Sequence, residues 1–264
     1  MVKLSISNIA WAVEHDTEMY RYLRDNGYQG LEIAPTRVFP DHPYNRIEEA
    51  RGWALKLKEE YRLGISSMQS VWYGRQENIF GSVNERKILI EYTKQAICFA
   101  EAIGCGNLVF GCPRNRDTND VAGCMPMAIP FFRELGDFAL EHHTVVALEA
   151  NPVIYNTRFM NTTEQAVEMA CKSGSEGIKV NIDLGTIIYN KENIEYLYQV
   201  SEYINHVHIS EPGLDIIRSG RLIRQTMKLL EEIGYDRFVS IEMKNGGDIE
   251  MVKTVMRYIN GLNQ

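Results

Sequence analysis

Four side chains of kinds that commonly bind metal ions follow short apolar runs in the second half of the sequence. Glu149 ends the run VVALE, and Asp183 ends IKVNID. His208 lies in HVHIS, and Glu242 lies in SIEM. A charged group in such a buried place is costly unless it is paired or binds a metal. Each residue alone has an ordinary explanation, such as an ion pair or a core histidine, but the four together favour a shared ion.

Three carboxylates and one imidazole form an oxygen-rich ligand set, which suits hard divalent cations. We therefore predict one divalent metal ion held by Glu149, Asp183, His208 and Glu242. Mn²⁺ is favoured, and Mg²⁺, Co²⁺ and Zn²⁺ are the other candidates.

A second group of residues lies close to predicted strand ends and has side chains suited to binding a polar small molecule or its charged groups. The residues predicted to bind substrate are Gln69, Trp72, Arg114, Asn151, Glu211 and Lys244. An amide can bond a hydroxyl, an indole can pack against the apolar face of a ligand, and an arginine can bind phosphate or carboxylate. Packing residues, solvated surface arginines and a loop carboxylate remain the alternatives.

Two further polar residues fall inside predicted strands. Glu32, in GLEIA, is either a pocket residue or half of a buried ion pair. His206 lies two residues before His208, so it points to the same side of its strand, one layer deeper. We interpret His206 as a core histidine, with a supporting role behind the metal as the alternative. Arg75 and Arg116 are candidates to join Arg114 in binding an anion.

Eight short apolar runs alternate with longer amphipathic stretches along the chain. The runs predict strands, and the stretches predict helices. The predicted strands are 3–8, 30–34, 65–70, 107–111, 145–150, 178–183, 205–210 and 238–243. The predicted helices are 17–26, 46–62, 84–103, 126–142, 163–173, 192–202, 217–233 and 248–261.

Strict alternation of strands and helices implies a parallel sheet, and eight such units in 264 residues favour closure into a barrel. An open doubly wound sheet is the alternative, but no glycine-rich turn follows the first predicted strand. We therefore predict an α/β fold, a single (β/α)8 TIM barrel domain over residues 1–264. Its active site is expected at the C-terminal end of the strands.

The composition limits the classes of partner. A net charge of -7 argues against a nucleic-acid partner, which usually needs a basic face. The sequence has neither a signal-peptide pattern nor an apolar run long enough to span a membrane, so we expect a cytoplasmic protein without a membrane partner. Five cysteines, an odd number without a CxxC pair, fit a reducing compartment. A homo-oligomer is expected only by analogy with other barrels.

The motifs LEANP, NIDLGT, HVHISEPG and SIEMK resemble those of the xylose isomerase-like TIM barrel superfamily, in particular its sugar phosphate isomerase/epimerase branch. The resemblance extends over essentially the whole chain. It implies a metal site on Glu149, Asp183, His208 and Glu242. In the related ketose 3-epimerases the two glutamate ligands also move the proton, which implies that Glu149 and Glu242 are the catalytic residues here.

The resemblance to ketose 3-epimerases fails at three positions. Thr186 stands where they carry a histidine, Leu214 where they carry an arginine, and Tyr155 where they carry a second glutamate. The resemblance therefore implies the metal centre of these enzymes in this chain, but not their ketose substrate. Endonuclease IV-type repair enzymes, which share the barrel and bind three zinc ions, need more histidines than this chain offers.

The resemblance implies a metal-dependent isomerase or epimerase of carbohydrate metabolism, acting on a sugar or sugar phosphate by proton transfer through a metal-bound enediolate. One alternative is a metal-dependent, inosose dehydratase-like enzyme that eliminates water from a keto-polyol. Another is a sugar-binding barrel without turnover, against which the presence of both Glu149 and Glu242 speaks.

Overall fold

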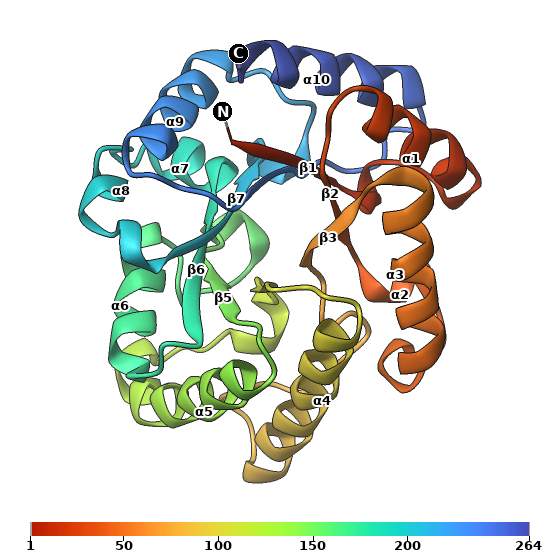
Figure 1. Ribbon diagram of the computed structural model, residues 1–264. Coiled ribbons are helices and arrows are strands. Elements are labelled where there is room, and N and C mark those ends of the chain that lie inside the picture. The colour runs from red at the N-terminus through yellow and green to blue at the C-terminus, as the bar shows by residue number, and fades with distance from the viewer. Residues whose placement is uncertain (1, 264) are drawn as a thin grey trace.

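The computed structural model describes residues 2–263, in which eight parallel strands close into one barrel in chain order. Each strand pairs with its neighbour, and the first pairs with the eighth (Figure 1). The strands are β1 (Lys3–Ser7), β2 (Gly30–Ile33), β3 (Gly64–Met68), β4 (Leu108–Phe110), β5 (Val146–Glu149), β6 (Ile178–Asp183), β7 (Ile204–Ile209) and β8 (Phe238–Ile241). The predicted (β/α)8 barrel is confirmed. The outer limits of the predicted domain, residues 1 and 264, lie outside the described residues.

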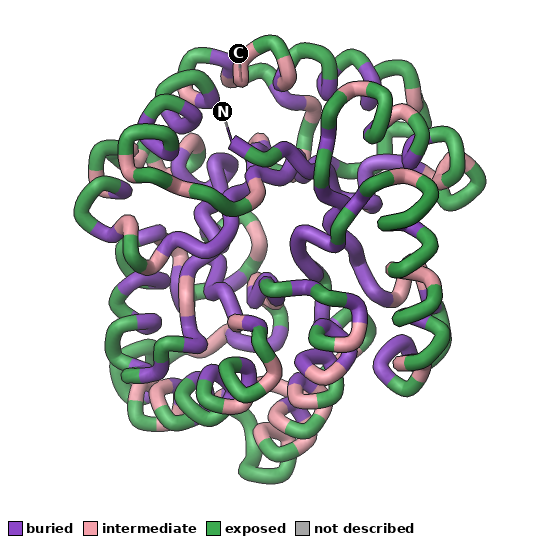
Figure 2. Tube along the Cα trace, in the orientation of Figure 1, coloured by how far each residue is buried: buried purple, intermediate pink, exposed green. Residues whose placement is uncertain are grey.

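Helices surround the barrel, and their outward faces are exposed while the strands are buried (Figures 1 and 2). They are α1 (Asp16–Asp25), α2 (Pro35–Val38), α3 (Ile47–Tyr61), α4 (Val83–Ala102), α5 (Val121–Glu141), α6 (Thr163–Ser173), α7 (Leu184–Asn190), α8 (Tyr196–Gln199), α9 (Gly220–Glu232) and α10 (Ile249–Leu262). No helix within residues 2–263 is long and apolar enough to cross a membrane.

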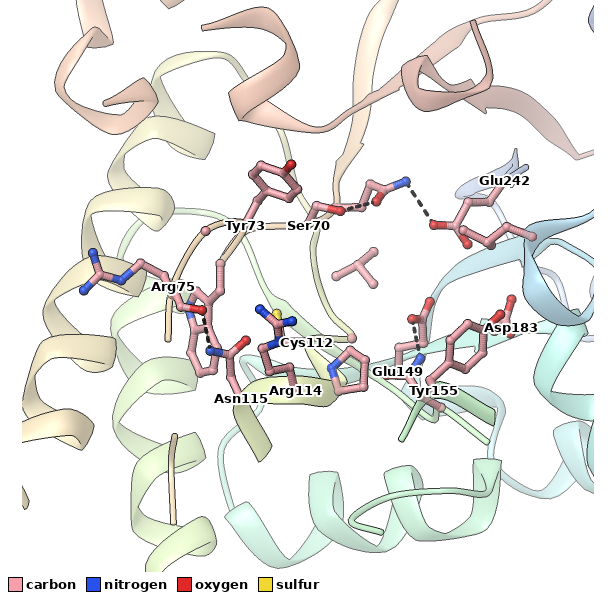
Figure 3. A pocket seen from close by; sticks show the side chains of 18 residues that line it. Ser70, Tyr73, Arg75, Cys112, Arg114, Asn115, Glu149, Tyr155, Asp183 and Glu242 are labelled. Carbon is pink, nitrogen blue, oxygen red and sulfur yellow. Dashed lines mark hydrogen bonds between the residues drawn. The ribbon is translucent and has the colours of Figure 1, made fainter. Parts of the chain in front are cut away.

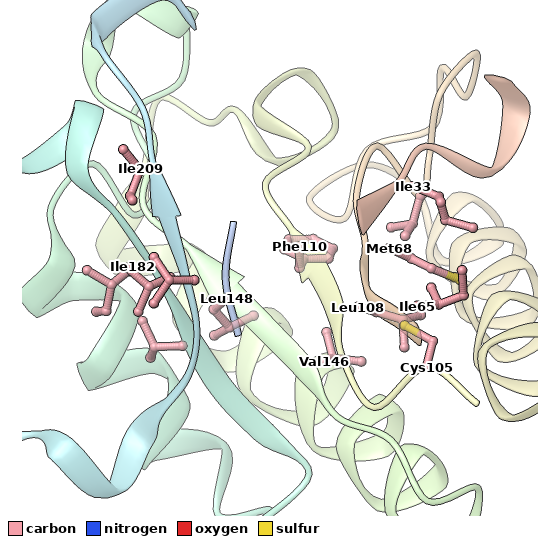
Figure 4. Close-up of a cluster of buried hydrophobic side chains, with 14 of the residues drawn as sticks. Ile33, Ile65, Met68, Cys105, Leu108, Phe110, Val146, Leu148, Ile182 and Ile209 are labelled. Carbon is pink, nitrogen blue, oxygen red and sulfur yellow. The ribbon is translucent and has the colours of Figure 1, made fainter. Parts of the chain in front are cut away.

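The two faces of each strand differ in chemistry, because successive side chains point to opposite faces. Apolar strand residues such as Leu148 and Ile182 belong to the buried hydrophobic cluster (Figure 4). The cluster also includes side chains of the surrounding helices. Their neighbours Glu149, Asn181 and Asp183 are also buried but point to the polar interior of the barrel. The fold is therefore held by the apolar layer, and the chemistry lies on the opposite face of the same strands.

All eight predicted strands are found, with ends within two residues of the prediction. The predicted helix at 192–202 is wrong, because only α8 and a short 3-10 turn, Ser201–Tyr203, form there. The helix that follows β6 is instead α7, which begins directly after Asp183. Its sequence, LGTIIYN, contains a glycine and β-branched residues of low helix propensity. Burial of Leu184 and Ile187 stabilises the helix, which propensity alone does not predict.

Candidate metal centre

The four predicted metal ligands come together at the C-terminal end of the barrel. Glu149 and Asp183 are the last residues of β5 and β6, His208 lies in β7, and Glu242 directly follows β8. All four are buried, and one ligand atom from each lies within 4.8 Å of the others. Neighbouring parallel strands place their carboxyl ends side by side, and Asp183 and His208 are direct partners in the β6–β7 ladder. The spacing and the donor types fit a divalent cation.

His208 presents one ring nitrogen to the carboxylates and the other to the barrel interior. Its Nδ1 lies 3.0 Å from Glu149 Oε1 and 3.2 Å from Glu242 Oε2. Its Nε2 lies 2.9 Å from Glu32 Oε2. Burial alone would lower the pKa of His208, but the charges of Glu32 and Glu242 outweigh burial and hold that pKa well above its ordinary value. Glu32 thereby fixes the ring with Nδ1 toward the cluster.

Glu32 is a buried ion-pair residue rather than a pocket residue. Its Oε2 contacts both His206 Nε2, at 2.8 Å, and His208 Nε2. Burial would raise the pKa of Glu32, yet the two histidines hold it well below its ordinary value. His206 is buried one layer below His208 and does not belong to the four-residue cluster. It supports the cluster through Glu32, as a second layer often does in metal sites.

Two carboxyl groups of the cluster, those of Asp183 and Glu242, have raised pKa values, so their ionised forms are disfavoured. Burial, with the nearby charge of Glu149, raises the pKa of Asp183. Burial raises the pKa of Glu242 to about 7, against the opposing influence of His208. Desolvation and like charge both disfavour the ionised forms, and a divalent cation among these oxygens would relieve both. This electrostatic imbalance is a second indication that the residues fit a metal.

Three buried amides donate to the two glutamates of the cluster. Gln69 Nε2 lies 2.9 Å from Glu242 Oε1, and Asn151 Nδ2 lies 3.0 Å from Glu149 Oε2. Asn181 Nδ2 lies 2.6 Å from Glu149 Oε1. Gln69 and Asn151, predicted to bind substrate, thus hold carboxylates of the cluster. Asn181 was missed, although its position two residues before Asp183 on the same strand face was a signal that could have identified it.

Arg116 is fully buried behind Glu149, so its predicted place as an anion-binding residue at the cavity mouth is wrong. Its Nη2 donates to Asn151 Oδ1 at 2.6 Å and to the Glu149 carbonyl at 2.9 Å. Because a guanidinium can only donate, Asn151 must turn its oxygen to Arg116 and its NH₂ group to Glu149. Burial lowers the pKa of Arg116 to about 10, so the group stays charged at neutral pH.

Asp183 is oriented by the segment that follows it. Its Oδ2 accepts the backbone N–H of Thr186 at 2.8 Å, the arrangement of a helix N-cap at the start of α7. The Thr186 hydroxyl lies 2.8 Å from the same oxygen, and the Ser210 hydroxyl donates to Oδ1. Thr186, which replaces the histidine of ketose 3-epimerases, therefore positions a predicted metal ligand.

A cavity of about 580 Å³ opens above the cluster (Figure 3). Its walls come mainly from the loops after β3, β4 and β5, with Leu214 from the loop after β7. Of the residues predicted to bind substrate, Gln69, Trp72, Arg114 and Asn151 line it. Trp72 is mostly a packing residue, since it is 2% exposed and its Nε1 donates to Thr93 Oγ1. Tyr155 also lines the cavity, and its hydroxyl accepts the backbone N–H of Gly213 at 3.0 Å.

The structure places Glu211 and Lys244 outside the set of residues that line this cavity. Glu211 Oε1 accepts the backbone N–H groups of Arg218 and Ser219, at 2.8 and 2.7 Å, and so acts as a loop carboxylate. Lys244 is exposed, and its backbone N–H donates to the Leu214 carbonyl. A role for either residue in substrate binding would require the loops to move.

Gly111 directly follows β4, and its lack of a side chain leaves space for the carboxylate of Glu149. A Cβ atom at this position would lie 2.7 Å from Glu149 Oε2, closer than real Cβ contacts allow. A glycine is therefore needed here because the Glu149 side chain approaches the backbone closely, and not because the chain turns. No local pattern distinguishes this glycine from the others among the 20 in the chain.

Comparison with known proteins agrees with the barrel. The family model described as xylose isomerase-like TIM barrel matches residues 20–261. The solved structure of 3-keto-D-glucoside 4-epimerase, YcjR, from E. coli is similar, with a TM-score of 0.80 and 20% identity over 99% of this chain and 100% of that one. The structure of D-psicose 3-epimerase from Clostridium cellulolyticum H10 with D-tagatose has a TM-score of 0.79 and 16% identity, over 99% of this chain and 98% of that one. The structure of IolI protein with a zinc atom has a TM-score of 0.75 and 15% identity, over 99% of this chain and 98% of that one. No curated protein matches the sequence.

Proposed function

Because the chain belongs to the xylose isomerase-like TIM barrel family, we propose that it is a divalent-metal-dependent sugar isomerase or epimerase. The observation that carries this proposal is the buried cluster of Glu149, Asp183, His208 and Glu242 at the bottom of the cavity. Two proteins of similar structure that are named as epimerases support it. Fold alone does not determine function, so the proposal depends on the chemistry of the site.

In this proposal the four cluster residues hold the cation. When bound, such a cation polarises a sugar carbonyl and lowers the pKa of the neighbouring C–H group. Mn²⁺ is our first choice, because three of the four ligands are carboxylates.

Glu149 and Glu242 are the residues that we propose to move the proton. They come from β5 and from the end of β8, and both line the cavity. His208 Nδ1 lies between one oxygen of each. One glutamate removes the proton from the carbon beside the carbonyl, and the other returns a proton to the opposite face, which inverts that carbon. Return of the proton to the former carbonyl carbon isomerises the sugar instead.

The cavity walls would orient the sugar and limit the access of water. Gln69 and Asn151 keep the carboxylate oxygens of Glu242 and Glu149 in place through their amide N–H groups. Leu214 gives apolar surface, against which the carbon face of a sugar can pack. Tyr155 and Leu214 stand where the ketose 3-epimerases carry charged residues, so we expect a substrate that differs from a simple ketose.

Proton transfer from carbon can be tested in deuterated water. The protein is freed of metal with EDTA, reloaded with Mn²⁺ and incubated with a panel of keto-sugars. We expect deuterium at the carbon beside the carbonyl, only in the metal-loaded protein, together with an epimer or isomer. An unsaturated product would reassign the protein as a dehydratase. Ligand binding without exchange by any member of the panel would contradict the proposal and favour a binding barrel.

A further inference from the structure

Five charged side chains line the cavity, and one of them has no partner among residues 2–263. The carboxylates of Glu149, Asp183 and Glu242 form the cluster at its bottom. Arg75 donates to both carboxylate oxygens of its neighbour Glu77. The guanidinium of the fifth, Arg114, makes no hydrogen bond and no ion pair with any residue in the described part of the chain. Figure 3 shows it in the cavity, on the side away from Asp183 and Glu242.

The turn that carries Arg114 is firmly held. The short 3-10 turn Pro113–Arg116 follows β4, and its residues Asn115 and Arg116 are buried. Asn115 Nδ2 donates to the carbonyls of Glu77, at 2.7 Å, and Arg75, at 3.2 Å. Arg116 Nη2 donates a hydrogen bond to the Glu149 carbonyl at 2.9 Å. Of the residues in this turn only Arg114 is exposed, so a fixed backbone presents one free cation to the cavity.

A guanidinium in this position fits an anionic group of the ligand. Its planar N–H groups match the oxygens of a carboxylate or a phosphate, which can accept two parallel hydrogen bonds. The cavity, at about 580 Å³, is in the range of small-molecule sites and has room for a group beyond the reacting carbons. Repulsion by the cluster carboxylates favours an anion on the far side of the cavity, where Arg114 lies.

We infer that the substrate is an acidic sugar, whose carboxylate or phosphate, at the end remote from the reacting carbonyl, is bound by Arg114. This inference rests on the proposed function, because it assumes that the carbonyl end of the substrate lies at the cluster. It adds the class of substrate, which the cluster alone does not define.

Three probes that differ only at C6 test the inference: D-fructose, D-fructose 6-phosphate and D-fructuronate. The end of the molecule is a hydroxyl in the first, a phosphate in the second and a carboxylate in the third. Binding to the Mn²⁺-loaded protein is measured by titration calorimetry, and deuterium exchange is measured in parallel. We expect at least one charged probe to bind about tenfold or more tightly than D-fructose, and its identity distinguishes phosphate from carboxylate.

Arg114→Gln should abolish most of that preference, since it removes the charge and keeps a polar side chain. Arg75→Gln is the matched control, because Arg75 lines the same cavity but is already paired with Glu77. The preference should persist in this control. Equal binding of all three probes, no binding of either charged probe, or an equal loss for all probes in Arg114→Gln would overturn the inference.

The two proposals can fail separately. A preference for a charged probe that depends on Arg114, without deuterium exchange in any probe, supports an acidic ligand and contradicts the isomerase or epimerase. Exchange in D-fructose as fast as in both charged probes supports the enzyme and contradicts the acidic substrate.

Discussion

At the scale of single residues, the candidate site is defined by what fixes each carboxylate. Both oxygens of Glu149 accept an amide N–H, from Asn151 and Asn181. One oxygen of Glu242 accepts from Gln69 and the other faces His208. Such fixed partners preorganise a site, since a side chain that is already oriented loses less entropy when it binds or reacts. Replacement of a ligand and replacement of its support should therefore have different effects.

Glu242→Gln should abolish turnover while the fold remains intact. The amide is nearly the same size as the carboxylate but cannot accept a proton, and loss of a general base costs roughly 10²–10⁴-fold in rate. Deuterium exchange and circular dichroism measure the two effects. Glu211→Gln is the control, because that carboxylate bonds only loop backbone and should leave exchange close to normal. A near-normal rate in Glu242→Gln would refute its assigned role.

Gly111→Ala should weaken metal binding without unfolding the protein. The new Cβ would meet the flexible end of Glu149, which can turn away, rather than the backbone. We expect Mn²⁺ affinity to fall by about tenfold or more, the range seen when a ligand loses its support. Gly106→Ala is a matched control, because a Cβ there meets nothing within 4 Å. Equal Mn²⁺ affinity in the two variants would contradict this account.

Arg116→Met should lower activity while leaving stability unchanged or higher. Arg116 is a fully buried cation whose Nε and Nη1 have no partner among the described residues, so an apolar side chain of similar length avoids a desolvation cost. Without it, Asn151 Oδ1 loses its donor, and the Asn151 amide that bonds Glu149 is no longer held in place. We expect kcat to fall about 10–100-fold with no decrease in Tm. If kcat is unchanged, the hydrogen bonds of Arg116 do not position Glu149.

At the scale of elements, the alternation of side chains along each strand separates stability from chemistry. Strand β6 shows this: Val180 and Ile182 pack outward with the hydrophobic cluster, while Asn181 and Asp183 face the barrel interior. The same strand end then starts helix α7, with Asp183 as its N-cap. The predicted metal ligand and the helix start are thus one structural unit.

Thr186→Val tests that unit. The substitution keeps the shape but removes the hydroxyl that lies against Asp183 Oδ2 and the Ala150 carbonyl. We expect the free energy of unfolding to fall by about 1–2 kcal/mol, and Mn²⁺ affinity to fall as well. Thr254→Val, an exposed hydroxyl that bonds its own helix, should change neither quantity. A Thr186 variant with normal Mn²⁺ affinity would show that the backbone N-cap suffices to hold Asp183.

At the scale of the whole molecule, the closed barrel concentrates charge at one end. In the metal-free protein, Glu242 with its pKa raised to about 7 contributes stability below about pH 4.5, and this contribution is lost as the pH rises through 7. Asp183, whose pKa is also raised, acts in the same direction. The metal-free protein should therefore lose part of its stability as the pH rises, whereas a bound cation favours the ionised carboxylates.

Mn²⁺ should consequently bind more tightly at higher pH. Between pH 5.5 and 7.5 a carboxyl group with a pKa near 7 becomes mostly ionised, so we expect a gain in affinity of roughly 20–30-fold. The shift in Tm on adding Mn²⁺ should grow over the same range, and EDTA should reverse it. The dependence on pH should flatten in Glu242→Gln. A Tm shift that is independent of pH in the unaltered protein would contradict the assignment of Glu242 as a ligand.

The sequence by itself determined the barrel and its four-residue cluster, because both depend on local order along the chain. Strand and helix periodicity is local, and a polar residue at each strand end marks the edge at which parallel strands must meet. Glu149, Asp183, His208 and Glu242 could be selected on that basis alone. The family resemblance then added a metal and a reaction class.

Only the tertiary structure decided which groups support the cluster and which face the open cavity. Arg114 and Arg116 are two residues apart in one motif, yet one is exposed in the cavity and the other is fully buried. Gln69 and Asn151 bond carboxylates, and Gly111 lies beside Glu149. Most of these contacts join residues far apart in the sequence. The direction of a side chain within a loop depends on tertiary packing, which a local sequence pattern does not predict. The physical reason is that burial and contact are properties of the closed barrel and not of any segment of it.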